Sequence, residues 1–205
     1  DISHIEKYVT DIKKSISFTM NEIEIRGELY LPKNTKYDTK GRPLRNNCVG
    51  LINRKENIED LKYVRFIAYQ IDGMDINSES SKIELLKKHG FNTINTIIFS
   101  GISELDNIYS EYLSVLRNEW EYETDGLIIA VDDNSLYDEI DSRWVVDHHH
   151  HYSIALKPPA EYKESQLKFI DWQISRQGNI IPVAVFEPII IGGAVIERAS
   201  LTNAE

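Results

Sequence analysis

The chain has 205 residues, of which 41% are hydrophobic and 27% are charged, and its formal net charge is −10. These values are typical of an ordinary soluble globule with one sizeable domain or one and a half small ones. The negative charge excludes a protein coated with basic residues for binding phosphate, although it is compatible with a local basic cleft. The acids concentrate in residues 119–123 and 132–141, which indicates solvated surface.

Targeting and redox signals are few. No apolar run approaches the roughly 20 residues needed to cross a bilayer, and no signal-peptide pattern is present, so we expect no membrane contact and a cytoplasmic location. The single cysteine, Cys48, cannot form an internal disulfide or a cysteine-based zinc site, which fits a reducing compartment. Richness in Ile, Asn, Lys and Tyr is typical of an AT-biased genome, such as that of some viruses and phages.

A helix and a strand are the first predicted elements. Residues 5–16 have helical spacing, and residues 23–31 alternate apolar and polar side chains up to Pro32, as an edge strand does. Because side chains alternate between the two faces of a strand, Arg26 and Glu28 share a face. A charged pair on one face suggests a nucleotide pocket, and an ordinary exposed strand face is the alternative.

Four further elements are expected before residue 125: an exposed loop at 33–47, a buried strand at 64–71, a short helix at 80–89 and a longer helix at 102–120. The loop is rich in Lys, Asn, Gly and Pro. A turn at Asp72-Gly73 ends the strand, and Gly90 ends the short helix. The apolar spacing of the longer helix indicates that it covers a sheet.

The remaining predicted elements are strands. The apolar run at 127–131 predicts a central strand buried on both faces, and 152–156 predicts another strand. Closely spaced strands are then expected at 167–175, 180–187 and 189–196, with glycine-containing turn signals between them, which is the rhythm of a small β-barrel. We therefore expect a domain boundary near residues 161–165, with one unit at 1–163 and a second at 164–205.

Several segments, in this order, resemble NAD-dependent DNA ligases over the whole chain. Four resemble strands of the family's adenylation domain: Arg26-Gly27-Glu28, Phe66-Ile67-Ala68-Tyr69, Thr124-Asp125-Gly126-Leu127-Ile128-Ile129 and Ile154-Ala155-Leu156-Lys157. Residues 173–188 and 198–203 are similar to the family's oligonucleotide-binding barrel. The resemblance implies an α+β fold, in which part of a nucleotidyltransferase (adenylation) domain is followed by the first strands of an OB-fold β-barrel.

The resemblance also implies a reaction that seals nicks in duplex DNA with NAD and Mg²⁺. A lysine amine attacks the α-phosphate of NAD, the AMP passes to the 5′-phosphate at the nick, and a 3′-hydroxyl displaces it. Lys157 and Asp125 resemble the family's catalytic contacts, Lys157 to phosphate, while Glu28, beside Arg26, resembles the acceptor for the ribose hydroxyl. Residue type alone leaves open a surface lysine, an Arg26–Glu28 pair and a turn-forming Asp125-Gly126.

Arginines occur where the family contacts DNA, and solvated surface positions are the alternative for each of them. Arg54 is displaced by one residue from the family's position. The four candidates are Arg45, Arg54, Arg117 and Arg176.

Two departures from the family pattern bear on catalysis. The sequence has no K-x-D-G motif, and Ala130 stands where the family has a lysine after the apolar run. We therefore expect the nucleophilic lysine to come from a partner chain or from an N-terminal region absent here. A catalytically inactive, ligase-derived binding or structural subunit is the second interpretation. The third is an ATP-using nucleotidyltransferase, such as a capping enzyme.

The four consecutive histidines His148 to His151 offer a further candidate site. Four successive side chains cannot all face one ion, so we expect a histidine-rich loop and no metal site.

Overall fold

The computed structural model describes residue 5 and residues 7–9, 23–39, 42–56, 58–143 and 150–201. Most of the helix expected at 5–16 lies outside these residues. The described elements are β1 (Glu24–Tyr30), α1 (Leu44–Ile52), η3 (Ile58–Tyr63), β2 (Arg65–Asp72), α2 (Glu79–Lys88), α3 (Ile102–Glu111), η4 (Tyr112–Leu116), α4 (Arg117–Glu119), β3 (Leu127–Ala130), η5 (Asn134–Leu136), α5 (Tyr137–Ser142), β4 (Ser153–Leu156), β5 (Leu167–Ile174), β6 (Ile180–Ile191) and β7 (Ala194–Ser200). Helices and antiparallel sheets confirm the predicted α+β class.

Strands β1 and β2 confirm the two strands predicted from the sequence, and they form an antiparallel pair. The register shifts between Arg26 and Gly27, whose partners are Gln70 and Ala68, so β2 contains a bulge at Tyr69. A Cβ atom at Gly27 would lie 2.3 Å from the carbonyl oxygen of Ile67 and 2.3 Å from the ring of Phe66. Glycine is therefore required where the two strands approach each other.

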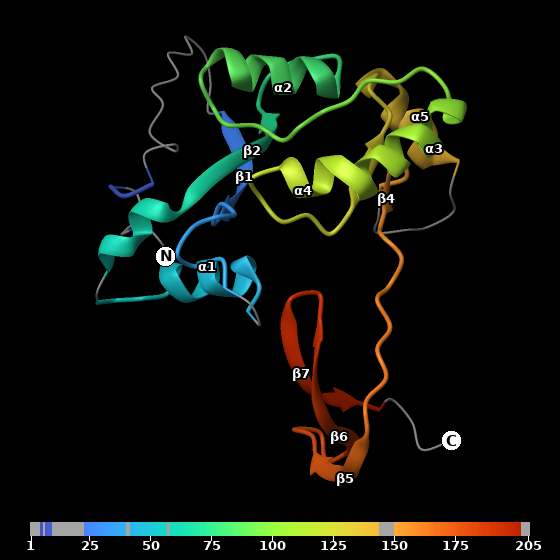
Figure 1. Ribbon diagram of the computed structural model, residues 1–205. Coiled ribbons are helices and arrows are strands. Elements are labelled where there is room, and N and C mark those ends of the chain that lie inside the picture. Colours follow the sequence, from blue (N-terminus) through green and yellow to red (C-terminus); the bar gives the residue numbers. More distant parts are fainter. Residues whose placement is uncertain are drawn as a thin grey trace.

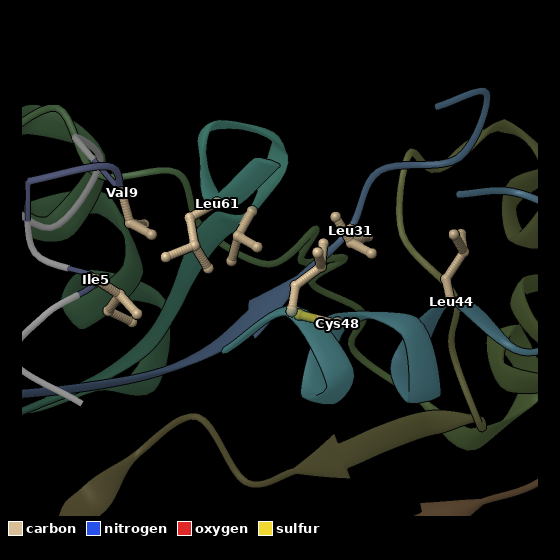
Figure 2. Packing of buried hydrophobic residues seen from close by; sticks show 8 residues of the cluster. Ile5, Val9, Leu31, Leu44, Cys48 and Leu61 are labelled. Carbon is tan, nitrogen blue, oxygen red and sulfur yellow. The ribbon is translucent and has the colours of Figure 1, made fainter. Parts of the chain in front are cut away.

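Helices pack on both sides of the β1–β2 pair, with α1 and α2 on opposite sides of it in Figure 1. On the α1 side, buried apolar side chains form one cluster, and Figure 2 shows Leu44 and Cys48 pointing from α1 toward Leu31. On the α2 side, Ile83 and Leu86 pack with buried residues of β2. Burying these side chains is the main favourable term for folding this region.

Helix α1 corrects the prediction of a loop over residues 33–47, because the helix already begins at Leu44. Leu44, Cys48 and Leu51 are buried at helical spacing. Pro43 stands at the position before the helix, where its missing N–H costs no hydrogen bond. The polar residues on the exposed side of the helix gave the segment its loop-like composition.

Helix α2 confirms the helix expected at 80–89. Ser78 caps its start by accepting a hydrogen bond from the Ser81 N–H (3.2 Å), and Gly90 follows its end with a φ of 81°. Asp132 adds a second cap from beyond β3, because its carboxylate accepts the Ser80 N–H at 2.7 Å. The exit of β3 is thereby fixed to the start of α2.

The long helix predicted at 102–120 is present as α3, η4 and α4, which follow one another without a break. Its middle part, η4, is a π-helical turn, and such turns concentrate at functional sites. The expectation that the helix covers a sheet is wrong for α3, none of whose residues is buried, whereas Tyr112 in η4 is fully buried.

Among the helices of the described residues, none is both long and apolar enough to span a membrane.

Strands β3 and β4 pair antiparallel where the sequence predicted strands. The expectation that β3 is buried on both faces is wrong, because Ile128 is 71% exposed. On β4, Ile154 is 68% exposed. Two strands alone cannot cover each other's faces, so a continuous apolar run is left partly open to solvent.

Strands β5, β6 and β7 form a three-stranded antiparallel sheet. The predicted division into strands at 180–187 and 189–196 is wrong, since β6 continues to Ile191 and its register against β7 shifts between Val185 and Ile189. The turn to β7 is made by Gly192 and Gly193, with φ values of 54° and 77°. In Figure 1 the extended segment 157–166 leads from β4 to this sheet.

Candidate functional site

The loop before β3 touches the end of β4. A Cβ atom at Gly126 would lie 2.6 Å from the Leu156 carbonyl oxygen and 3.1 Å from the Cα atom of Lys157. Because Gly126 has no side chain, the backbone beside Asp125 can approach the backbone of Lys157 this closely. The Asp125 side chain is 88% exposed and Lys157 is also exposed, so a carboxylate and an ammonium group are presented on neighbouring backbone segments.

Arg45, in the first turn of α1, joins this pair. Its Nη1 atom donates to Oδ2 of Asp125 at 3.5 Å, and its backbone N–H donates to Oε2 of Glu123 at 3.4 Å. Sequence reasoning missed Glu123. The acidic run at 119–123 that precedes Asp125 was the available signal, but it was interpreted as solvated surface.

Glu28 is exposed on β1, which contacts α1 one residue further along. The Sγ atom of Cys48 donates to the Leu29 carbonyl oxygen at 3.5 Å, and Cys48 follows Arg45 by one helical turn. The contacts therefore run from β1 through α1 to Asp125, Gly126 and the end of β4.

Arg26 does not pair with Glu28. Its Nε atom lies 2.6 Å from Oε1 of Glu24 and 3.5 Å from Oδ2 of Asp72. The hydrogen bond to Glu24, together with both carboxylates' charge, raises the pKa of Arg26. A surface hollow beside this cluster is lined by Ile23, Glu24, Asp72 and Gly73 and includes none of Glu28, Asp125 and Lys157.

Lys33, just beyond β1, fixes this end of the sheet to the segment that leads to Asp125. Its backbone N–H donates to the Glu121 carbonyl at 2.6 Å, and its Nζ donates to the Arg117 carbonyl at 2.7 Å. Burial lowers the pKa of the Lys33 ammonium. The Tyr30 hydroxyl donates to the Glu121 carboxylate. These contacts were not predicted from the sequence.

A row of aromatic rings continues from there to α3. Neighbouring ring centroids lie 5.6 to 6.3 Å apart, within the range of favourable aromatic pairs, along the series Tyr30, Tyr122, Trp120, Tyr112, Tyr109. The hydroxyl of the last ring, that of Tyr109, donates a hydrogen bond of 2.8 Å to the carbonyl of Lys157, the residue that follows β4. The row thus links the end of β1 to the end of β4.

Two family models of known proteins match this chain. The family model described as "NAD-dependent DNA ligase adenylation domain" matches residues 1–161. The chain belongs to the NAD-dependent DNA ligase family. The model described as "NAD-dependent DNA ligase OB-fold domain" matches residues 164–205. The predicted fold, an adenylation-domain part followed by OB-fold strands, is confirmed, and the alternative of an ATP-using nucleotidyltransferase does not fit a family of NAD-dependent enzymes.

Curated relatives agree with this assignment. The DNA ligase of Lactobacillus gasseri is 29% identical over 223 residues, covering 100% of this chain and 32% of the relative. The DNA ligase of a Sulfurihydrogenibium species is 30% identical over 231 residues, with the same two coverages. That of Herpetosiphon aurantiacus is 29% identical over 198 residues, covering 89% of this chain and 29% of the relative. The chain spans about a third of the length of these ligases.

Three other arginines are assigned to DNA by resemblance to the ligase family: Arg54, Arg117 and Arg176. Arg54 is exposed just after α1, and Arg117 is exposed at the start of α4, where its carbonyl holds Lys33. Arg176 is exposed in the turn between β5 and β6, and so belongs to the OB-fold part of this ligase-family chain. The structure brings together Arg45, Asp125 and Lys157, but not Arg176.

The histidine run before β4 is described from His150 onward. His150 Nδ1 lies 3.4 Å from Oδ2 of Asp141, and the His151 N–H donates to Oδ1 of Asp141 at 2.7 Å. The His151 N–H, more than the His150 ring, lowers the pKa of Asp141. In the described part of this ligase-family chain, no three His, Cys, Asp or Glu side chains gather as metal ligands.

Cys48 gives a pH-dependent test of the packing under β1. Burial, with a smaller contribution from the Glu28 charge, raises the pKa of the thiol from its ordinary 9.0 to about 11. The unfolded chain therefore loses this proton first, and the thiol's contribution to stability is complete below pH 9 and disappears as the pH rises through 11. We expect wild type to lose about 2 kcal/mol more than Cys48→Ala between these limits in urea unfolding. Equal losses would contradict the buried thiol.

Proposed function

We propose that this chain forms one side of the adenylate pocket and part of the DNA path of a ligase that seals nicked duplex DNA. A second polypeptide, or an N-terminal region, supplies the K-x-D-G lysine. The observation that carries the proposal is the close approach at Gly126, which brings the backbone next to Asp125 against the backbone of Lys157. Residues 1–163 form the adenylation part and residues 164–205 the start of the OB-fold.

The roles of the individual side chains follow from their chemistry. Lys157 contacts the adenylate phosphate, where a fixed cation stabilises the charge that develops during transfer. Glu28 accepts a hydrogen bond from the ribose, and Arg26 lies two residues earlier on the same nucleotide-facing side of β1. Asp125 is the group for Mg²⁺, which binds proteins through one or two carboxylates and retains waters and phosphate oxygens as its other ligands.

The fit of these residues to NAD and Mg²⁺ rests on their exposure. The carboxylates of Glu28 and Asp125 and the ammonium of Lys157 are open to solvent, and the contact from Arg45 to Asp125 is long, at 3.5 Å. A ligand can therefore bind without breaking a buried ion pair. When bound, Mg²⁺ would neutralise phosphate charge, while the chain's own residues bind and orient the nucleotide.

Four arginines form the proposed DNA contacts. Arg45, Arg54 and Arg117 lie on exposed positions of the adenylation part, and Arg176 lies on the first hairpin of the OB-fold part. The chain as a whole carries a net charge of −10, so binding to a phosphate backbone depends on such local cations. Arginine suits this role because its planar group donates two parallel hydrogen bonds to phosphate.

Exposed isoleucines on both faces of the β3–β4 sheet support the need for more polypeptide. Ile128 and Ile154 are largely exposed on a sheet of two strands, which is marginally stable by itself in water. A polypeptide that covers this sheet beside Lys157 would also be in a position to present the nucleophilic lysine to the same phosphate.

An adenylate-transfer assay tests the proposal. This chain is mixed with a polypeptide that carries the K-x-D-G segment, as a separate chain or fused ahead of residue 1, and with NAD labelled in its adenylate. We expect covalent label on the added lysine and sealing of a nicked duplex with both polypeptides together, and no sealing with either alone. No label with both present would favour the inactive module.

Ala130 supplies a gain-of-function prediction. It occupies the end of β3, exposed and paired with Ser153, where a lysine side chain has room. Ala130→Lys is expected to raise adenylate transfer in the completed assembly about tenfold, because it adds a cation beside the nucleotide. Ala199→Lys, also exposed but on β7 of the separate three-stranded sheet, is the matched control and should leave the rate unchanged. Equal effects would show that added charge, and not position, matters.

A catalytically inactive, ligase-derived subunit is the second candidate function. Ala130 favours it, because the family's cation is missing there. In this case neither Ala130→Lys nor the added K-x-D-G polypeptide would produce label, while the four arginines would still bind nicked DNA.

A further inference from the structure

Two tyrosines on the long helix hold the two backbone segments of the candidate site. The hydroxyl of Tyr109, near the end of α3, donates to the Lys157 carbonyl at 2.8 Å. The hydroxyl of Tyr112, at the start of η4, shares a hydrogen bond of 2.9 Å with Oγ1 of Thr124, the residue before Asp125. One helix thus contacts the chain next to both candidate catalytic side chains.

The two tyrosines form a unit. They are three residues apart, so they lie on neighbouring positions of one helix face. Their rings stack with centroids 6.3 Å apart and an interplanar angle of 21°. Tyr112 is fully buried and packs on Trp120, so the unit is anchored in the aromatic row.

We propose that Tyr109 and Tyr112 are positioning residues that set the separation of Lys157 and Asp125. This inference rests on the proposed function, because it gives a role to the spacing of those two side chains. A side chain reaching phosphate from the end of a four-residue strand depends on where its backbone is held. The hydrogen bond from the Tyr109 hydroxyl to the Lys157 carbonyl holds the backbone of Lys157. The hydrogen bond between Tyr112 and Thr124, together with the close backbone approach at Gly126, holds Asp125 near it. Catalysis depends steeply on such placement.

A measurement on the chain alone tests the geometry. Tyr109→Phe removes one hydroxyl and keeps the ring, so the stacking on Tyr112 is preserved. We expect amide hydrogen exchange to become about five- to tenfold faster in residues 153–157 and unchanged in β1 and β2. Tyr162→Phe, which removes the hydroxyl of a tyrosine that is 90% exposed, is the control and should change neither. Unchanged exchange in Tyr109→Phe would overturn the inference.

A kinetic cycle in the assembly with the K-x-D-G polypeptide tests the role. Tyr109→Phe is expected to lower kcat for adenylate transfer about tenfold while KM for NAD changes less than about twofold. In a Lys157→Ala background the same substitution should have no further effect, because it acts through Lys157. An equal loss in both backgrounds would show a general structural role and overturn the inference.

The two experiments separate the possible failures. If wild type transfers no adenylate, the proposed function fails, and the exchange measurement still shows whether Tyr109 holds the end of β4. If wild type is active and Tyr109→Phe matches it in kcat, the positioning role fails while the proposed function stands.

Discussion

Lys157→Ala is expected to lower adenylate transfer in the completed assembly by about 100- to 1,000-fold. Removing one fixed donor that stabilises developing charge has an effect of this size in other enzymes. Lys157 is exposed at the end of β4, and its backbone is held by Tyr109, so truncating its side chain should leave the fold intact. Single-turnover transfer from labelled NAD measures the rate, and thermal unfolding checks the fold.

The matched control is Lys87→Ala, which removes an exposed lysine from the last turn of α2. It should leave transfer unchanged, since α2 packs on β2 and not on the strand that carries Lys157. A loss smaller than about threefold for Lys157→Ala would remove this lysine from the phosphate contact.

The second large effect is expected from Gly126→Ala. The added Cβ would meet the Leu156 carbonyl oxygen at 2.6 Å, a backbone atom that cannot rotate away, so β3 and β4 must separate. We expect a loss of about 1 to 3 kcal/mol in unfolding free energy, as for other overpacked sites. Transfer should fall about 100-fold, since a displacement of about 1 Å is enough for that effect.

Gly50→Ala separates this clash from the general effect of the substitution. Gly50 lies within α1, and a Cβ atom there would have Arg42 Nη2 as its nearest neighbour at 3.5 Å, an ordinary contact. Alanine stabilises a helix interior by about 1 kcal/mol relative to glycine. Gly50→Ala should therefore be neutral or stabilising and fully active. A stable, active Gly126→Ala protein would show that the close approach is not needed.

Much of the fold followed from local patterns. Alternation predicted β1, and glycine or aspartate-glycine punctuation located β2, α2 and β3. The wrong predictions, for α1 and for the burial of β3, concern properties that depend on the rest of the structure. Helix α1 was hidden because three polar residues separate its first two buried positions, Leu44 and Cys48, and the burial of β3 depends on how many strands flank it. Neither property is contained in a short window of sequence.

The candidate site was predicted in part. Resemblance selected Arg45, Asp125 and Lys157, and the structure brings them together. The contacts that position them were invisible in the sequence, because they join residues far apart in the chain: Tyr109 is 48 residues from Lys157, and Arg45 is 78 from Glu123. A tyrosine on an amphipathic helix has the same appearance in sequence whether its hydroxyl meets water or a distant carbonyl.

The open sheet of β3 and β4 has a consequence for the living cell. Exposed isoleucines on unflanked strands are the kind of surface that chaperones retain, proteases degrade and aggregates incorporate. If the ligase is divided between two polypeptides, selection would act on their dosage as well as on their chemistry. Synthesis of both in equal amounts and at the same time, as from neighbouring genes under one promoter, would shorten the interval in which this surface is uncovered.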